Sequence, residues 1–172
     1  AFASATAGTA NAYAYLLPAV HQVVDGATSA TMSFVNSGTF DAHADAKAVG
    51  NKAYAQATVQ GVEQEGDLGG VPALAEFANS SSFSVGALAS ASGTTNSDAS
   101  AVARGYWVEG NVDSVDISNS GTFGVAATAI GTDDAHAVAT GIYVDVPGAI
   151  DGTIVNSKTL TVAAKAIGGA GA

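Results

Sequence analysis

The chain has 172 residues, with 15 Asp and Glu against 5 Lys and Arg, a formal net charge of −10 and no cysteine. It lacks the clustered Lys and Arg that displace counterions from phosphates, which excludes general nucleic-acid binding, and the absence of cysteine excludes disulfides, thiolate catalysis and cysteine-ligated zinc. No apolar run reaches the ~20 residues of a membrane-spanning helix, so we expect one domain, 1–172, without a transmembrane segment.

A five-residue motif recurs along the chain and divides it into repeats. It reads Asn-Ser-Gly-Thr-Phe at 36–40 and 119–123 and returns in altered form at 79–83 and 156–160. Asn and Gly tolerate a positive φ angle, so the motif predicts a sharp structural corner. The approximate repeats are 1–35, 36–78, 79–118, 119–155 and the partial repeat 156–172. The corner residues are Asn36, Asn79, Asn119 and Asn156, with Gly38 and Gly121.

Apolar residues occupy every second position after each corner, which predicts a β-strand with one buried face. A second alternating strand follows at 53–57, 99–103 and 135–139. A helix, which alanine favours, would scatter these positions around its circumference, and a disordered Ala/Gly tract would lack the fixed aromatic positions. The expected core columns are Phe40, Phe83, Phe123 and Leu160, and Ala44, Ala87, Ala127 and Ala164.

Equivalent residues in stacked columns predict an all-β fold, a parallel β-solenoid (β-helix) of about four coils of ~40 residues with a flattened, alanine-rich core. Each coil would hydrogen-bond to the next at ~4.8 Å, and the corner asparagines would form an amide ladder. The phenylalanine column would fill the wider end of the core. One coil per repeat is favoured over two of ~20 residues, because the motif and the aromatic position occur once per repeat; the handedness stays open.

The segments between the alternating strands differ in length. Residues 63–70, 108–113 and 144–148 are rich in Gly, Pro or acidic residues, and we expect them to be loops. Neither end of the chain carries a polar cap, so both terminal coils would expose strand edges. The chain is therefore expected to be a slice of a longer solenoid or a subunit that stacks on copies of itself.

Two segments carry a family resemblance. Ala-Thr-Gly-Ile at 139–142 and Gly-Thr-Ile-Val-Asn-Ser at 152–157 resemble the degenerate repeats of bacterial autotransporter and related adhesin passenger domains. The rhythm of 87–93 is also similar to the shorter head repeats of trimeric adhesins. The resemblance implies a secreted or surface-displayed right-handed β-helix, outside the cell or on the bacterial cell surface, whose function lies in its loops or in its length.

The densest polar cluster comprises Asp133, Asp134 and His136. Two carboxylates act as acid and base only at a suitable separation and with unequal pKa values, whereas neighbouring acids at a turn commonly just solvate it. We therefore expect no catalytic residues and no enzyme. His21, His43 and His136 have no metal-ligand spacing, so we also expect no metal site.

No cofactor is expected for this chain. Loosely bound calcium is the one alternative that stays open, either at Asp133 and Asp134 or at Glu63, Glu65 and Asp67. The other interpretation of these acids is that they are exposed and keep the protein soluble.

Aromatic residues offer a possible ligand surface. Tyr13, Tyr54 and His136 lie between the inward alanines of the second strand, in what reads as one outward column, and exposed aromatic rings can stack on sugars or on a partner protein. The alternative is cross-strand packing that stiffens the sheet. The pair at 106–107 contains the single Trp and is expected to pack in a corner, with Arg104 able to stack on either ring.

Three functions fit these features. The leading one is an extracellular structural protein, an adhesin shaft or self-assembling surface-fibre subunit, whose partners are copies of itself or flanking coils of a longer chain. The second is an adhesin module that binds glycans or a host surface. The third, a β-helix polysaccharide-degrading enzyme, is disfavoured because no acidic cluster recurs on one face beside a basic residue.

Overall fold

The computed structural model describes residues 1–25, 30–66, 73–147 and 150–169, which lie almost entirely in β-strands. No helix occurs in these ranges, and so none that could cross a membrane. In chain order the strands are β1 (Phe2–Thr6), β2 (Thr9–Leu16), β3 (Val20–Val24), β4 (Ala30–Asn36), β5 (Thr39–Gly66), β6 (Ala73–Asn79), β7 (Ser82–Gly110), β8 (Val112–Asn119), β9 (Thr122–Ile130), β10 (Asp134–Asp145), β11 (Asp151–Asn156) and β12 (Leu160–Ile167).

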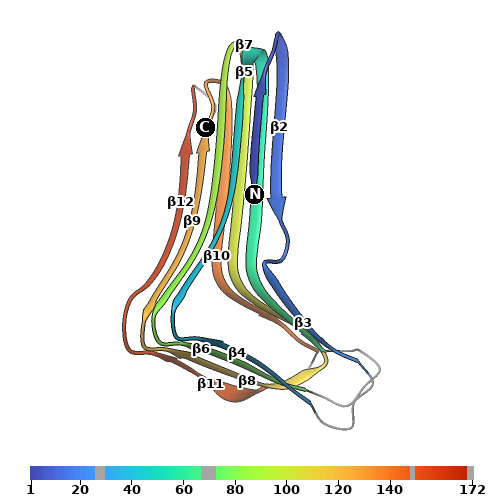
Figure 1. Ribbon diagram of the computed structural model, residues 1–172, viewed down its shortest axis with the longest axis vertical. Helices are drawn as coiled ribbons and strands as arrows, with labels where there is room; N and C mark the ends of the chain where they lie inside the picture. The colour runs from blue at the N-terminus through green and yellow to red at the C-terminus, as the bar shows by residue number, and fades with distance from the viewer. Residues whose placement is uncertain (26–29, 67–72, 148–149, 170–172) are drawn as a thin grey trace.

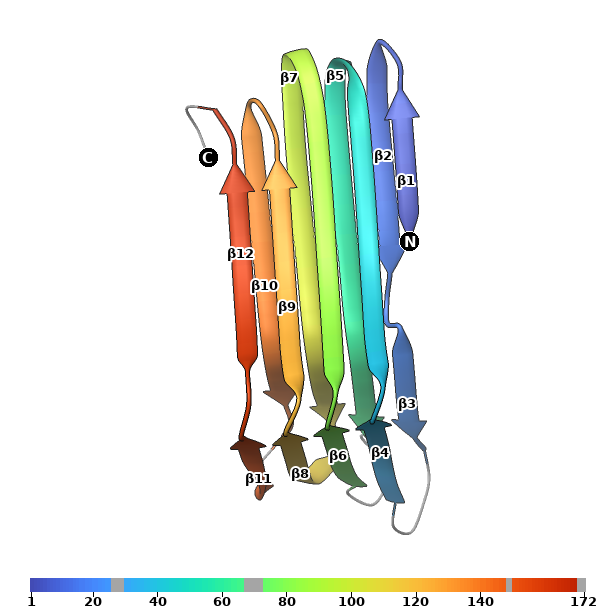
Figure 2. The same ribbon diagram turned by 60° about the vertical axis from the view of Figure 1, so that its left-hand side comes forward.

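The strands form two parallel sheets. The eight-stranded sheet runs β1-β5-β7-β9-β12, with β2 and β3 also on β5 and β10 on β7, and the four-stranded sheet runs β11-β8-β6-β4. Strand pairs join equivalent residues of successive repeats, so Asn36, Asn79, Asn119 and Asn156 are neighbours in turn. Figure 2 shows the repeats side by side from β1 to β12. The all-β prediction and the parallel arrangement of strands are confirmed.

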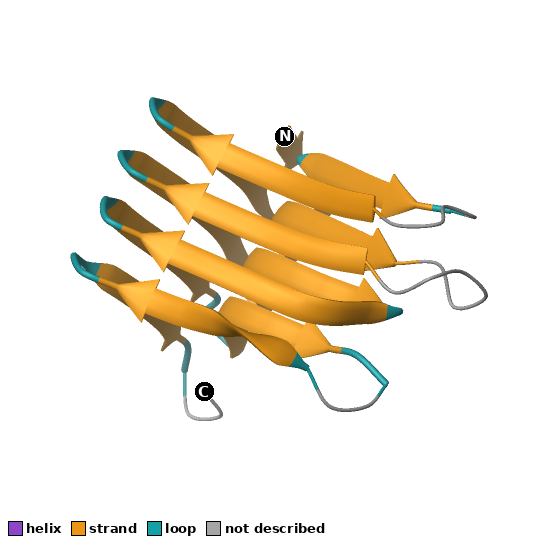
Figure 3. Cartoon of the chain, turned by 90° about the horizontal axis from the view of Figure 1, so that it is seen from below, coloured by secondary structure: helices purple, strands orange, loops and turns teal. Residues whose placement is uncertain are grey.

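Two long walls and a short sheet line the core (Figure 1). β5 and β7 each run up one side and return down the other, turning near Gly50 and Gly93. We call the side formed by β1, the first halves of β5 and β7, β9 and β12 the first wall, and the side formed by β2, β3, the second halves of β5 and β7, and β10 the second wall. The short sheet of β4, β6, β8 and β11 lies across their lower ends (Figures 1 and 3).

Alanine side chains fill the narrow part of the core, and phenylalanine rings fill the wider part. Ala44 on the first wall and Ala55 on the second are fully buried, and their methyl groups allow the walls to lie close together in the upper part of Figure 1. Lower down the walls diverge, and phenylalanine rings fill the wider space: Phe83 stacks on Phe123 at 4.7 Å between ring centroids, while Phe77 meets Phe83 edge-on at 5.3 Å.

The last repeat does not bury its core positions. Leu160 and Ala164 pair in register with Phe123 and Ala127, as the sequence columns require, yet Leu160 is 40% exposed and Ala164 is exposed too. The expectation that both belong to the core is wrong in this chain, because among the described strands none lies beyond β12.

A glycine bend interrupts the second wall. Gly61 and Gly105 occupy equivalent positions, and the strand pairing is broken at both. A Cβ at Gly105 would lie 2.5 Å from Gly141 O and 2.8 Å from Cζ of Phe123, so the backbone here leaves no room for a side chain. In β7 buried residues alternate up to Gly105, and the alternation then shifts by one, so that Tyr106 and Val108 face inward. Val62 and Gln64 hold the equivalent inward positions of β5.

This shift explains why three expected loops are largely strands. Residues 63–66 continue β5, 108–110 continue β7, and 144–145 continue β10. Their acidic residues point outward from strands, and the sequence period is broken by the bend, not by a loop. Val146 and Pro147 follow the end of β10 and are not in a strand, and residues 67–70 and 148 of the predicted loops lie outside the described residues.

Candidate functional site

The corner asparagines form a continuous amide ladder. Nδ2 of Asn36 donates to Oδ1 of Asn79 at 2.8 Å, and the same bond joins Asn79 to Asn119 and Asn119 to Asn156, each at 2.7 Å. Asn36, Asn79 and Asn119 are buried, whereas Asn156 in the last repeat is exposed. The predicted ladder is therefore present, and every step runs in the same direction, from donor to acceptor toward the C-terminal end.

Each ladder step also fixes the backbone of the corner. The remaining N–H of Asn79 donates to the carbonyl oxygen of Thr122 in the next repeat at 3.0 Å, and Asn36 makes the equivalent bond to Ser82 at 2.8 Å. These bonds satisfy buried amides that would otherwise cost about 1–3 kcal/mol each. The ladder thus couples neighbouring repeats through side chain and backbone together.

The corner glycines do not use a positive φ. Among the described residues, positive φ occurs only at Gly110 and Gly152, so the corner at Gly38 and Gly121 forms without the left-handed backbone that glycine permits. At Gly121 a Cβ would lie 2.0 Å from the carbonyl oxygen of Ser81, whereas at Gly38 it would meet nothing within 4 Å. Close approach of the preceding repeat, and not the backbone angle, requires glycine at 121.

The last described repeat continues the apolar columns of the core with exposed residues. Ile154 on β11 is 65% exposed and Val162 on β12 is 42% exposed. These residues pair with Ile117 and Val125, which are buried. The inner face of the last repeat therefore presents, to solvent, the same apolar columns that hold the preceding repeats together.

The tyrosines do not form the single column that the sequence suggested. Tyr13 pairs with Gln56, and Tyr54 pairs with Asn11 and Asp98, so Tyr13 and Tyr54 lie diagonally, two residues out of register. Their rings nevertheless approach to 5.6 Å between centroids. Tyr15, which sequence analysis did not single out, stacks on Tyr13 at 6.3 Å.

His136 is separated from these rings. It pairs with Ser100 on the neighbouring β7, and Ser100 pairs with Gln56, so His136 lies three strands from Tyr13, roughly 14 Å at the usual strand spacing. Tyr13, Tyr15 and Tyr54 thus form one aromatic cluster, and His136 is exposed on its own.

A buried polar cluster fills the corner below the glycine bend. The Tyr106 hydroxyl donates to Oε1 of Gln64, and Nε2 of Gln64 donates to Oε1 of Gln22 at 2.6 Å and to the carbonyl oxygen of Glu76 at 3.1 Å. Burial raises the pKa of Tyr106 far above its usual value, which keeps the hydroxyl protonated as a donor. Sequence analysis missed Gln64, because strict alternation before the bend places it on the outer face.

Trp107 lies on the opposite side of the strand from Tyr106. Its ring stacks on Tyr143 of the next repeat at 3.9 Å between centroids, and the guanidinium carbon of Arg104 lies 5.1 Å from it. Corner packing was expected for both residues of the pair; Tyr106 is buried there, and Trp107 is a half-buried outer residue. The bend reverses which of the two faces the core.

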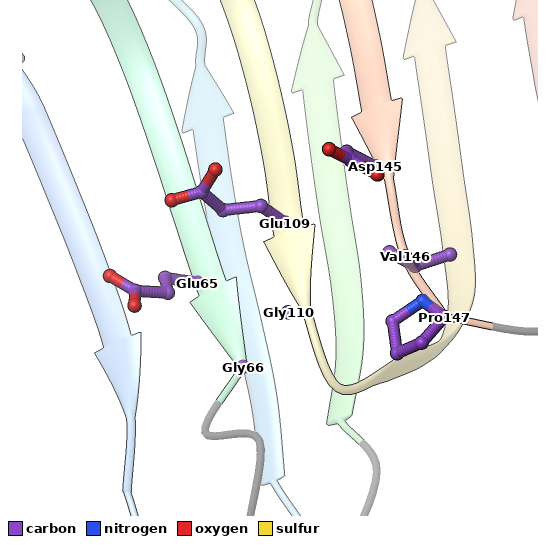
Figure 4. A pocket seen from close by; sticks show the side chains of 7 residues that line it. All are labelled: Glu65, Gly66, Glu109, Gly110, Asp145, Val146 and Pro147. Carbon is purple, nitrogen blue, oxygen red and sulfur yellow. The ribbon is translucent and has the colours of Figure 1, made fainter.

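Acidic side chains line an open groove at the lower end of the second wall (Figure 4). Glu65, Glu109 and Asp145 are neighbours on successive strands, beside a space of about 360 Å³ that Pro147 also borders. His21 lies 3.2 Å from Glu65. These acidic side chains carry the same charge and lie close together, so the electrostatic potential in the groove is negative.

Glu63 is the perturbed carboxyl of this region. Partial burial raises its pKa above the ordinary value, the carboxylates of Glu109 and Glu65 raise it further, and His21 acts in the opposite direction. The group therefore holds a proton more tightly than a free glutamate.

The expected polar cluster at the upper turn has a structural role. The Asp133 carboxylate accepts a hydrogen bond from the Ser97 backbone N–H at 2.7 Å, and the Asp133 N–H donates to the Ser97 carbonyl oxygen at 3.1 Å. Oγ of Ser97 lies 2.7 Å from Oγ1 of Thr132. These bonds tie the turn of one repeat to the turn of the preceding one.

Metal-binding geometry is not found in the described ranges, where no three His, Asp or Glu side chains converge on one point. Asp67, one of the residues considered for calcium, lies outside the described residues. His43 pairs with Asp41 at 2.6 Å on the outer surface of the first wall.

Comparison with known proteins gave no assignment. No family model matches the chain. Neither the search of curated proteins nor the search of solved structures gave a match. The proposals that follow therefore rest on the residues and their geometry.

Proposed function

We propose that the chain is an extracellular structural β-solenoid of about four coils, one coil of ~40 residues per repeat, and that it serves as an adhesin shaft or a self-assembling fibre subunit. In each coil the chain would pass from the short sheet to the first wall and then to the second wall. One observation carries the proposal: the apolar columns and the amide ladder continue, in register, into a last repeat whose inner face is exposed.

The energetics favour a load-bearing or assembling role. Strand pairing joins each repeat to its neighbours, so stability grows by adding equivalent interfaces. Unpaired strands at either end present backbone groups that another strand can bind. The net charge of −10 opposes sideways aggregation of such sheets. These features suit a protein on a cell surface or in a fibre, with copies of itself or flanking coils as partners.

Electron microscopy combined with sedimentation tests the proposal. Filaments or end-to-end oligomers that lengthen with protein concentration, and that diffract at the ~4.8 Å strand spacing along their axis, are the expected result. A chain that stays monomeric at all concentrations and salt conditions contradicts the self-assembling fibre version and leaves only the role as a shaft within one longer chain.

A glycan-binding or host-surface-binding module is the second candidate. The observation in its favour is the cluster of Tyr13, Tyr15 and Tyr54, in which Tyr13 and Tyr15 are each about half exposed, because exposed aromatic rings stack on sugar faces. Replacing Tyr13 and Tyr54 by alanine should abolish binding to a glycan array, while Tyr143→Ala should not. Retained binding in the double variant contradicts this candidate.

A further inference from the structure

The two ends of the stack present the same strand columns. At the C-terminal end β10 and β11 pair with β7 and β8 of the preceding repeat, and β12 extends the first wall by one further strand. At the N-terminal end β1, β2 and β3 pair with β5, and β4 pairs with β6. We propose that the C-terminal end of one copy binds the N-terminal end of a second copy head to tail, with β2 and β3 beside β10 and β4 beside β11.

This inference rests on the proposed stacking function and adds the partner, the orientation and the register. In the register of the chain's own strand pairs, Phe40 of the second copy would lie on Leu160, and Phe34 on Ile154. Leu160 and Ile154 are exposed, and Phe34 and Phe40 are only partly buried. Docking would therefore remove apolar surface of both copies from water. Each apolar column of one copy would continue with apolar residues of the other.

The amide ladder gives the junction a direction. Each asparagine donates toward the C-terminal end, so Asn156 presents Nδ2 at that end, where it now bonds the carbonyl oxygen of Lys158 in its own repeat at 2.9 Å. Asn36 presents Oδ1 at the N-terminal end, since its Nδ2 donates to Asn79 and Ser82. A head-to-tail contact joins donor to acceptor, whereas two like ends would oppose two donors or two acceptors.

Charge is also compatible with this register. An acidic protein that stacks on itself must avoid placing carboxylates opposite one another, because like charges on adjacent strands destabilise the pair. Extending the observed strand register across the junction brings Asp45 opposite Lys165 and each other acid of the paired strands opposite a neutral residue. The pairs are Asp134 with Asn11, Asp145 with Val23, Asp151 with Thr31, and Thr161 with Asp41.

One strand position is shared by both copies. Phe2 of β1 pairs with Asp45, and the same column leads through β7 and β9 to Lys165 of β12. In the docked pair, β1 of the second copy would thus meet the end of β12 from Lys165 onward. β1 pairs with β5 over five residues, whereas β12 pairs with β9 over eight, so β1 is the more weakly held segment and is the one that we expect to leave.

Proline variants can close one edge at a time. Ser80 N–H donates to Asn36 O, so Asn36 faces β6 and its neighbour Val35 presents its backbone groups to the open edge. Gly131 N–H donates to Ile167 O, so alternation directs the backbone groups of Val162 to the opposite, open edge of β12. Val35→Pro and Val162→Pro each remove an edge donor from an exposed position, where proline is tolerated.

Sedimentation of these variants, alone and mixed, tests the orientation. Each variant alone should remain monomeric at concentrations where the wild-type chain associates, and an equimolar mixture should form a one-to-one dimer through the two unblocked ends. A dimer of either variant by itself means that like ends meet, which overturns the head-to-tail inference but keeps the stacking function. A wild-type chain that never associates overturns this inference and, with it, the self-assembling fibre version of the proposed function.

Two further variants guard against misfolding of the proline chains. Asn156→Asp still accepts from Asn119 but cannot donate to Asn36, so association should weaken about tenfold, as for one lost hydrogen bond, with unchanged circular dichroism. Removal of residues 1–6 should tighten association, because it vacates the shared strand position. Unchanged association of Asn156→Asp, or weaker association after the deletion, contradicts the proposed junction.

Discussion

Nδ2 of Asn79 lies 2.7 Å from Oδ1 of Asn119, and both side chains are buried at the corner between the short sheet and the first wall. The bond is the middle step of a ladder that includes Asn36 and Asn156. Because the same amide also holds the backbone of Thr122, the ladder sets the spacing of neighbouring repeats as well as their register.

Asn79→Ala should lower the free energy of unfolding by roughly 2–4 kcal/mol, because it leaves buried amide and carbonyl groups of Asn36, Asn119 and Thr122 without partners. Asn156→Ala is the matched control: its side chain is exposed at the end of the ladder, and its loss should cost less than about 1 kcal/mol. Urea denaturation measures both values. Equal losses would mean that the buried ladder does not stabilise the corner.

Ala127→Leu should destabilise the fold by about 1–3 kcal/mol, since added methylenes overpack a filled core and Ala127 is 1% exposed. Ala164 occupies the next position of the same column and is exposed, so Ala164→Leu should change stability by less than about 0.5 kcal/mol. Thermal unfolding followed by circular dichroism compares the two. A wild-type melting temperature for Ala127→Leu contradicts close packing between the walls.

The corner motif and the two-residue period were sufficient to place the first wall and the short sheet, because these segments have the same length in successive repeats. Phe40 pairs with Phe83, and Ala44 with Ala87, as the sequence columns indicate. The exposure of Leu160 could not be read from the sequence in the same way, since it depends on which strands lie beside the last repeat.

The second wall shows why sequence alignment alone was insufficient. The register between β5 and β7 shifts at the upper turn, where Gly50 pairs with Gly93 but Lys52 pairs with Asn96. Tyr54 consequently pairs with Asp98, two positions from where aligned alanines had placed it. At Gly105 the backbone then breaks the alternation, which places Tyr106 in the core and Trp107 outside; a glycine column was the only available signal for this change.

Gly105→Ala should be strongly destabilising, because the new Cβ would lie 2.5 Å from the Gly141 carbonyl oxygen and 2.7 Å from Cγ2 of Val125. Relief requires movement of backbone in the next repeat, and we expect a loss of more than about 2 kcal/mol. At Gly124 the nearest atom would be 3.9 Å away, so Gly124→Ala serves as the tolerated control. Denaturant unfolding measures the free energy of unfolding of both variants. Equal stability of the two would contradict a bend that requires glycine.

Glu63→Gln should raise the melting temperature at neutral pH. The folded-state pKa of Glu63 is raised above 4.5, first by burial and then by Glu109 and Glu65, so its favourable protonated form is fully present below pH 4.5 and is lost as the pH rises through the raised value. Gln imitates the protonated form, and the advantage over wild type should therefore vanish below pH 4.5. Melting curves between pH 3 and 8 measure the difference in melting temperature between the variant and wild type. Added salt should reduce this difference at pH 7, because it screens the carboxylates. A variant less stable than wild type at pH 7 would mean that the charged form of Glu63 is the favourable one.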